Sequence, residues 1–146
     1  MVKACSWNLA GVGSDTIMSG GRTKRALVMN EMRALRCDVY LAQETHCGSY
    51  ETADEWQIEW KGLAYFTEHS TSRGGAAILF RAGLTPTILG VDICPAGHSV
   101  KVKCEIAGTV YTLVSVYAPS DPAERKRFFR TKLAGLLEGE NLIVGG

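Results

Sequence analysis

The sequence predicts an α/β domain in which mixed or antiparallel sheets are covered by helices on their outer faces. Three observations favour this class. The chain opens with a strand–helix–strand segment, continues with several consecutive strands, and ends with a helix and a strand. Consecutive strands joined by short turns favour antiparallel or mixed pairing, and their apolar faces then need a cover. With 146 residues, 46% of them hydrophobic and 21% charged, the chain fits one globular domain.

The amino-terminal elements are indicated by apolar spacing. Val28, Met32 and Leu35 recur at helical intervals with basic residues between them. Short apolar runs precede and follow this helix, and glycines punctuate the connection as far as Gly21. The expected elements are a strand over 2–9, a loop over 10–14, a helix over 22–35 and a strand over 37–43.

The middle of the chain predicts a run of strands. Residues 47–62 are acidic and weakly periodic, so we expect a loop with at most one helical turn there. Within 100–106 apolar and polar residues alternate, as in a strand with one solvent-exposed face. Ala107 and Gly108 suit a hairpin turn. The expected strands cover 63–67, 75–81, 86–92, 99–106 and 109–117.

Residues typical of a helix start predict a second helix after Asp121. Asp121 is a capping residue, Pro122 takes the first helical position, and Glu124 follows three residues after the cap. Gly139 is placed to end the helix. Its expected apolar stripe consists of Phe129, Leu133, Leu136 and Leu137. A last strand over 141–144 runs into Gly145 and Gly146, so close to the end of the chain that we expect 1–146 to be the amino-terminal portion of a single, longer domain.

Charge and cysteine usage limit the function classes only weakly. The net charge is +1, and the basic residues gather in two segments, 22–36 and 125–132. These segments fit either solvated helix faces or surfaces that contact phosphates. Five irregularly spaced cysteines favour a reducing compartment over a disulfide framework. The start turns polar too early for a secretory signal, and no apolar run reaches membrane-spanning length, so we expect an intracellular protein without membrane attachment.

Polar residues stand where the expected strands end. Asn8, Glu44 and Tyr117 each close a strand, as does Gly146. Loops at one rim of a sheet are common places for sites, and a carboxylate leaving a buried strand needs a cation or a donor. Glu44 is therefore a candidate Mg²⁺ ligand. The alternative is that the three polar side chains cap strands or bond to loop backbone.

Five motifs in order carry a resemblance: Ser6-Trp-Asn8-Leu-Ala-Gly11, Leu41-Ala-Gln-Glu44-Thr-His46, Gly74-Gly-Ala-Ala-Ile-Leu79, Val114-Ser-Val-Tyr117-Ala-Pro119 and Asn141-Leu-Ile-Val-Gly-Gly146. Together they resemble the endonuclease/exonuclease/phosphatase superfamily along the whole chain. They are most similar to the endonuclease domains of LINE-type (non-LTR) retrotransposons. Ala10 stands where apurinic endonucleases often carry an acidic or amide residue, which weakens the repair-enzyme reading.

The resemblance implies a two-layer β-sandwich of mixed or antiparallel sheets in a DNase I-like α/β/β/α arrangement, here incomplete. It implies hydrolysis of a phosphodiester with Mg²⁺, or with Mn²⁺ in its place, and DNA as partner. Carried over, Asn8 orients catalytic groups or phosphate, Glu44 binds the metal, and Tyr117 supports the scissile phosphate. The family's Asp-Phe-Asn motif and a distal Asp and His would follow Gly146. We therefore expect the remainder of a larger polyprotein after Gly146, a nuclear location, and no useful turnover from 1–146 alone.

Other functions stay open. One is a non-catalytic nucleic-acid-binding or interaction module of the same fold, and another is a phosphatase of the same superfamily. His46 is expected to form loop hydrogen bonds rather than to bind metal. Trp7 is expected to pack in the core or at its rim, whereas Trp56 and Trp60 could either pack or stack on bases.

Overall fold

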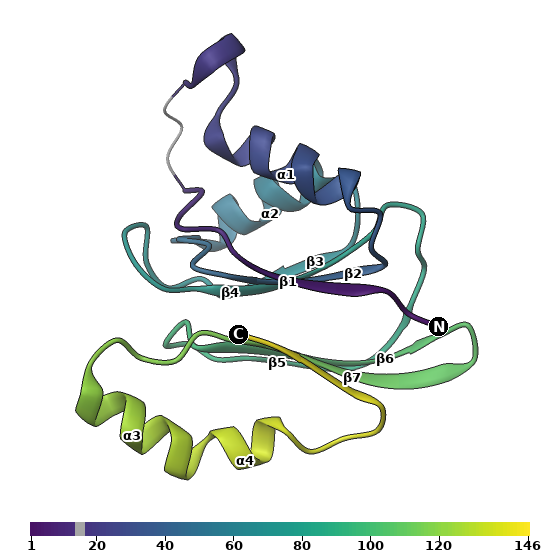
Figure 1. The fold of residues 1–146 in the computed structure, drawn as a ribbon, viewed down its shortest axis with the longest axis vertical. Helices are drawn as coiled ribbons and strands as arrows, with labels where there is room; N and C mark the ends of the chain where they lie inside the picture. Colours follow the sequence, from purple (N-terminus) through teal and green to yellow (C-terminus); the bar gives the residue numbers. More distant parts are fainter. Residues whose placement is uncertain (14–16) are drawn as a thin grey trace.

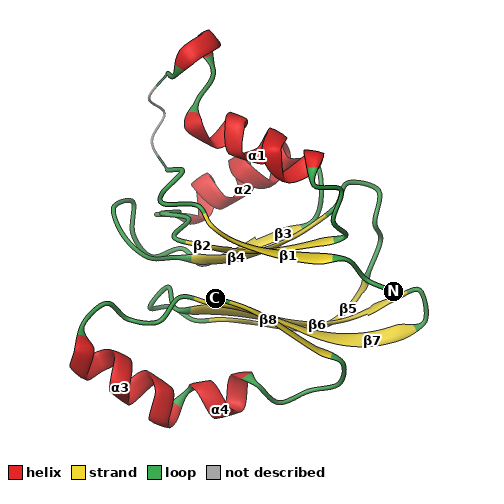
Figure 2. Ribbon diagram, in the orientation of Figure 1, coloured by secondary structure: helices red, strands yellow, loops and turns green. Residues whose placement is uncertain are grey.

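The computed structural model describes residues 1–13 and 17–146; position 14 of the predicted loop lies outside them. Two stacked four-stranded sheets are covered by helices on both outer faces, which gives four layers and confirms the predicted class (Figure 2). The strands are β1 (Ala4–Asn8), β2 (Val39–Gln43), β3 (Ala64–Phe66), β4 (Ala76–Phe80), β5 (Thr87–Ile93), β6 (Ser99–Ile106), β7 (Thr109–Val116) and β8 (Leu142–Gly145). The helices are the short 3₁₀ helix η1 (Ser19–Gly21), α1 (Lys24–Ala34), α2 (Tyr50–Trp60), α3 (Pro122–Thr131) and α4 (Leu133–Leu136).

The sheets are mixed, and their topology brings several strand ends to one rim. The first sheet has the order β1-β2-β4-β3 and the second β5-β6-β7-β8. In each sheet one pair is parallel, β1 with β2 and β7 with β8, and the remaining pairs are antiparallel. The helices α1 and α2 cover the first sheet, and α3 and α4 cover the second (Figure 1).

The core between the sheets follows the alternation read from the sequence. Val100, Val102 and Cys104 of β6 are fully buried between the two sheets. Lys103 and Glu105 of the same strand are exposed. The predicted hairpin is present because β6 and β7 pair from the turn outward. The turn residues Ala107 and Gly108 have φ of 50° and 81°, the left-handed values that such a two-residue turn requires.

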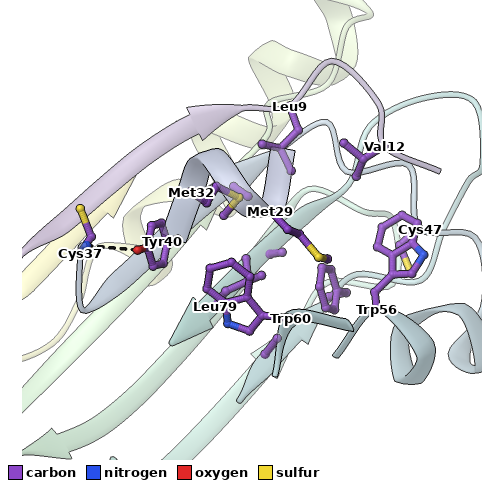
Figure 3. Packing of buried hydrophobic residues seen from close by; sticks show 14 residues of the cluster. Leu9, Val12, Met29, Met32, Cys37, Tyr40, Cys47, Trp56, Trp60 and Leu79 are labelled. Atoms are coloured by element: carbon purple, nitrogen blue, oxygen red, sulfur yellow. Dashed lines mark hydrogen bonds between the residues drawn. The ribbon is translucent and has the colours of Figure 1, made fainter. Parts of the chain in front are cut away.

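The prediction of a loop over 47–62 is wrong, because residues 50–60 form the 11-residue helix α2. The Ser49 side chain caps its first turn by accepting a hydrogen bond from the backbone N–H of Thr52 at 3.2 Å. Trp56 and Trp60, four residues apart, are both 1% exposed and pack on the first sheet (Figure 3). Burial excludes both rings from stacking on bases, whereas Trp7 is partly buried at the edge of the same cluster.

Two of the basic residues of α1 are engaged within the fold. Arg25 lies over the ring of Trp56, 5.2 Å from its centroid, and Nε donates to Glu59 at 2.6 Å. Arg33 lies over Trp60 at 5.1 Å and donates to the backbone oxygens of Glu59 and Trp60. These two arginines therefore pack over the two tryptophans and do not form a free phosphate-binding face.

The apolar stripe of the last helical segment differs from the prediction. The segment breaks at Lys132 into α3 and α4, and Phe128, not Phe129, points into the core. In α4, Leu136 is buried while Leu137 is 40% exposed. The start signals are confirmed: Asp121 Oδ2 accepts from the backbone N–H of Glu124 at 2.8 Å, with Pro122 at the first position.

The five cysteines, all within the described part of the chain, are free thiols. Over the same residues, no helix has both the length and the apolar character needed to cross a lipid bilayer.

Candidate active site at the rim of the two sheets

Three polar side chains meet where β1, β2 and β7 end. The loops after β1 and β2 run side by side, joined by Leu9 N–H to Gln43 O at 2.8 Å and by Gly11 N–H to Glu44 O at 2.7 Å. This ladder brings Asn8 next to Glu44, and Asn8 Nδ2 donates to Glu44 Oε1 at 3.2 Å. Asn8 Oδ1 in turn accepts from the backbone N–H of Ala10 at 2.9 Å. The amide of Asn8 is thereby oriented with its donor toward the carboxylate.

Tyr117 reaches the same carboxylate from the second sheet. Burial raises the pKa of its phenol, and the neighbouring Glu44 raises it further, both by its charge and as a hydrogen-bond acceptor. Tyr117 therefore stays a protonated donor at neutral pH. Its backbone is fixed by Tyr117 N–H donating to His98 O at 2.8 Å. The structure thus brings Asn8, Glu44 and Tyr117 together, while their chemical roles stay predictions.

The backbone of this rim is strained. Ala10, Glu44 and His46 have φ of 50°, 51° and 58°, in the left-handed region that residues other than glycine seldom adopt. Such conformations cluster at functional sites, where the surrounding structure holds them in place. The two turns also place Glu44 and His46 on the same side, with His46 Nε2 3.6 Å from Glu44 Oε2. Within the described residues the buried His46 Nε2 forms no hydrogen bond, so this atom does not make the expected bond to the loop.

A buried polar link holds the two sheets in register directly beneath the rim. Gln43 Nε2 donates to Ser115 Oγ at 3.0 Å, and Ser115 Oγ donates to Ala42 O at 2.7 Å. Gln43 and Ser115 are 3% and 0% exposed. Because a buried polar group is costly unless paired, this link favours one alignment of the sheets, the one that places Tyr117 above Glu44.

The end of β8 belongs to the same rim. Gly145 pairs with Ser115 and lies so close to β1 and β2 that a Cβ atom there would meet Ser6 Oγ at 2.6 Å and Leu41 Cβ at 2.8 Å. A side chain would separate the sheets at this point. Gly145 therefore lets β8 approach the first sheet on its way to the site.

The donor set fits a hard divalent cation only in part. The Glu44 side chain is 30% exposed, and within the described residues no Lys or Arg pairs with it. Its charge is met only by neutral donors and His46, so a cation would be favourable there. No group of three or more His, Cys, Asp or Glu side chains suited to a metal gathers anywhere in the described ranges. Among the described residues, Glu44 is the carboxylate at this rim that would hold such an ion.

Sequence reasoning missed a second set of residues beside Tyr117. His69, Arg73 and His98 line a cavity of about 280 Å³ that Tyr117 also borders. They come from two separate loops, and no local spacing in the sequence links them. The signal in the sequence is the register of the predicted hairpin, which sets His98 opposite Tyr117.

Comparison with known proteins supports the fold and the family. Residues 5–146 match the Endonuclease/Exonuclease/phosphatase family. The Transposon TX1 uncharacterized 149 kDa protein of Xenopus laevis is 32% identical over 123 residues, which cover 82% of this chain and 9% of that protein. The chain thus spans a small part of that curated relative.

Solved structures show the same architecture at low identity. A humanized D. rerio TDP2 has a TM-score of 0.67 at 18% identity, covering 99% of this chain and 61% of that one. An endonuclease/exonuclease/phosphatase from Bacteroides vulgatus has a TM-score of 0.68 at 11% identity, with 99% and 64% covered. An AP endonuclease from Archaeoglobus fulgidus has a TM-score of 0.53 at 18% identity, with 82% and 42% covered. Taken with the family match over nearly its whole length, these similarities show that the chain belongs to the endonuclease/exonuclease/phosphatase family.

Proposed function

We propose that residues 1–146 are the amino-terminal portion of a Mg²⁺-dependent endonuclease domain that nicks DNA as part of a retrotransposon protein. Family membership and the similarity to a transposon protein support this function. The observation that carries it is the Glu44 carboxylate at an accessible rim, bonded by Asn8 and bordered by Tyr117, with no Lys or Arg partner in the described ranges. A D. rerio TDP2 of this fold has been crystallised with a single-stranded DNA product. The partner proposed for this chain is likewise DNA.

Each of the three residues has a role that follows from its contacts. Mg²⁺, or Mn²⁺ in its place, would supply charge neutralisation and activation of water when held by Glu44. Asn8 fixes the orientation of the carboxylate because its amide is itself anchored on Ala10. Tyr117 keeps its proton and can donate a hydrogen bond to a phosphate oxygen.

The remaining catalytic groups are proposed to come from residues that follow Gly146 in a longer protein. The end of β8 packs against Ser6 and Val116 at the rim, so a continuing chain would start beside the three side chains. The resemblance implies an Asp-Phe-Asn motif there, whose Asp would position or deprotonate the attacking water. Residues 1–146 alone are then expected to show no turnover. A nuclear location within a larger polyprotein completes the proposal.

The test is a plasmid-nicking assay on the full-length protein. We expect relaxation of supercoiled plasmid with Mg²⁺ or Mn²⁺ and none with EDTA. Glu44→Gln keeps the size of the side chain and an acceptor for Asn8 but removes the charge, and it should lower the rate roughly a hundredfold or more. Glu105→Gln removes an exposed carboxylate at the opposite end of the molecule and should leave the rate unchanged. Nicking that survives in EDTA or in Glu44→Gln contradicts the proposal.

The plasmid-nicking assay, together with a phosphate-release assay, separates the alternatives. A non-catalytic module binds the plasmid and leaves it supercoiled under all conditions. A phosphatase of the same family leaves the plasmid intact but releases inorganic phosphate from small phosphorylated molecules or lipids. Either result contradicts the proposed endonuclease function and supports the corresponding alternative.

A further inference from the structure

A second pocket adjoins the candidate active site and shares Tyr117 with it. Its volume is about 280 Å³, and its walls come from the β3–β4 loop, the β5–β6 turn and the start of α3. The polar lining residues are His69, Arg73, His98, Tyr117, Ser120 and Glu124. This volume lies just below the roughly 300–1,000 Å³ of small-molecule sites, so the pocket would take no more than one nucleotide unit.

The pocket is held together by hydrogen bonds between its loops. Gly75 N–H donates to Gly97 O at 3.2 Å, which joins the β3–β4 loop to the β5–β6 turn. Tyr117 and His98 bond twice, by Tyr117 N–H to His98 O at 2.8 Å and between His98 Nδ1 and Tyr117 O at 3.2 Å. These bonds fix the position of the pocket relative to Tyr117, which also borders the candidate active site.

The bond to Tyr117 also determines the tautomer of His98. A carbonyl oxygen can only accept, so Nδ1 must carry the proton. In the neutral imidazole Nε2 is then an acceptor. The ring is held at its edge by Phe128, with centroids 5.7 Å apart. His98 thus brings an oriented acceptor to a pocket that it lines.

Arg73 gives the pocket its positive charge. Arg25 and Arg81 form ion pairs with Glu59 and Asp38, and Arg33 is bound to backbone oxygens. Arg73 is exposed, and the structure, over the residues it describes, gives it no carboxylate partner. An unpaired guanidinium in a pocket with hydrogen-bonding groups suits a phosphate. Glu124, which also lines the pocket, restricts where a second negative charge could lie.

We propose that this Arg73–His98 pocket receives the nucleotide next to the scissile phosphodiester, on the DNA strand that is cut. Arg73 contacts the phosphate of that nucleotide, and His98 Nε2 accepts a hydrogen bond from its sugar or base. Tyr117 is the wall common to both sites and sets the spacing between them. The inference rests on the proposed endonuclease function and adds the residues that hold the neighbouring nucleotide.

The first test is Arg73→Ala in the full-length protein, with Arg36→Ala as control. Arg36 is exposed and lies between α1 and β2, at the end of β2 opposite to Glu44. Binding of fluorescently labelled oligonucleotides is measured with Ca²⁺ in place of Mg²⁺. Arg73→Ala should raise Kd about tenfold and lower the salt dependence by about one phosphate contact. The KM for nicking should rise while kcat changes less than about twofold.

The second test uses two replacements of His98. Asn keeps a donor that can reach Tyr117 O but has no acceptor in the place of Nε2, whereas Ala has neither. His98→Asn should weaken oligonucleotide binding severalfold and leave kcat near wild type. His98→Ala should also lower kcat, because Tyr117 loses its support.

The outcomes distinguish the two proposals. Nicking by the wild type together with Arg73→Ala and His98→Asn variants that match Arg36→Ala overturns the pocket and leaves the endonuclease function. No nicking, with oligonucleotide binding that still depends on Arg73, overturns the endonuclease function and keeps the pocket as a nucleotide site. If Arg73 matters for binding of deoxyadenosine monophosphate but not of oligonucleotides, the ligand is a small phosphorylated molecule and the pocket proposal fails.

Discussion

Gln43 of the first sheet and Ser115 of the second are joined by a buried hydrogen bond of 3.0 Å, 72 positions apart in the chain. Ser115 Oγ in turn donates a hydrogen bond to Ala42 O, so the pair connects β7 to β2 twice. We expect Gln43→Ala to lower the free energy of unfolding by about 2 kcal/mol and Ser115→Ala by about 1 kcal/mol. Chemical denaturation of both single variants and the double variant measures the coupling.

The control for this link is Gln57→Ala. Gln57 is exposed on α2, and its loss should change stability by no more than about 0.5 kcal/mol. A coupling energy near zero between Gln43 and Ser115 would contradict the idea that the pair sets the register of the sheets.

Arg33 is expected to be the stabilising arginine of the helical layer. Its guanidinium bonds two backbone oxygens at the end of α2 and covers Trp60. Arg33→Ala should lower the unfolding free energy by roughly 2 kcal/mol, since it removes both kinds of contact. Arg36→Ala, at an exposed position of the same segment, should stay within about 0.5 kcal/mol. Equal midpoints in urea for the two variants would rule out this role.

Gly75 and Gly83 both have a backbone conformation that favours glycine, but a side chain would be crowded only at Gly75. Both have positive φ, 99° and 84°. A Cβ at Gly75 would overlap Thr45 Oγ1, whereas a Cβ at Gly83 would meet nothing within 4 Å. Gly83→Ala should therefore cost only the backbone strain, about 1 kcal/mol. Gly75→Ala should cost more than twice as much in thermal unfolding, and a smaller effect at Gly75 than at Gly83 would show that the rim adapts freely.

The buried thiol of Cys104 predicts a loss of stability in alkali. Burial between the sheets raises its pKa from 9.0 to about 11. Below pH 9 both folded and unfolded forms hold the proton. Between pH 9 and 11 the unfolded thiol ionises while the folded one does not, so stability falls as pH rises through this window, by up to about 3 kcal/mol.

Urea denaturation at pH 8 and pH 11 measures this loss, and Cys104→Val, which keeps the side chain apolar and removes the ionisable thiol, should reduce it. Cys94→Val, at the partly buried β5–β6 turn, is the control for removing a thiol. If Cys104→Val loses as much stability as the wild type between the two pH values, the buried thiol is not the cause.

The parts of the fold that could be predicted are those with strong local signals. The alternation of β6, the turn at Ala107 and Gly108 and the cap at Asp121 all appear as expected. The helix α2 was missed because its two buried tryptophans are one turn apart in an otherwise polar segment. Phe128 and Phe129 are adjacent, and the sequence carries no local signal that the helix ends as α3 at Thr131, so it does not determine which of the two rings is buried.

The candidate site likewise has parts that could be predicted from the sequence and parts that could not. Asn8 and Glu44 could be placed together because they close strands with similar patterns, which the structure pairs in parallel. His98 lies opposite Tyr117 because it continues the register of the β6–β7 hairpin by one pair beyond Ser99 and Val116, so this pairing follows from the predicted hairpin. The approach of His69 and Arg73 to Tyr117 depends on the path of the β3–β4 loop, which no spacing in the sequence encodes.

The division of the rim between two sheets has a consequence during synthesis. A ribosome-bound polypeptide that has emerged only as far as β4 possesses Asn8 and Glu44 but no Tyr117, and the groups come together only when the later strands have stacked on the earlier ones. An immature or half-folded molecule therefore carries no assembled centre. For a protein whose proposed target is a genome, assembly from two separate sheets delays any cutting until folding is complete.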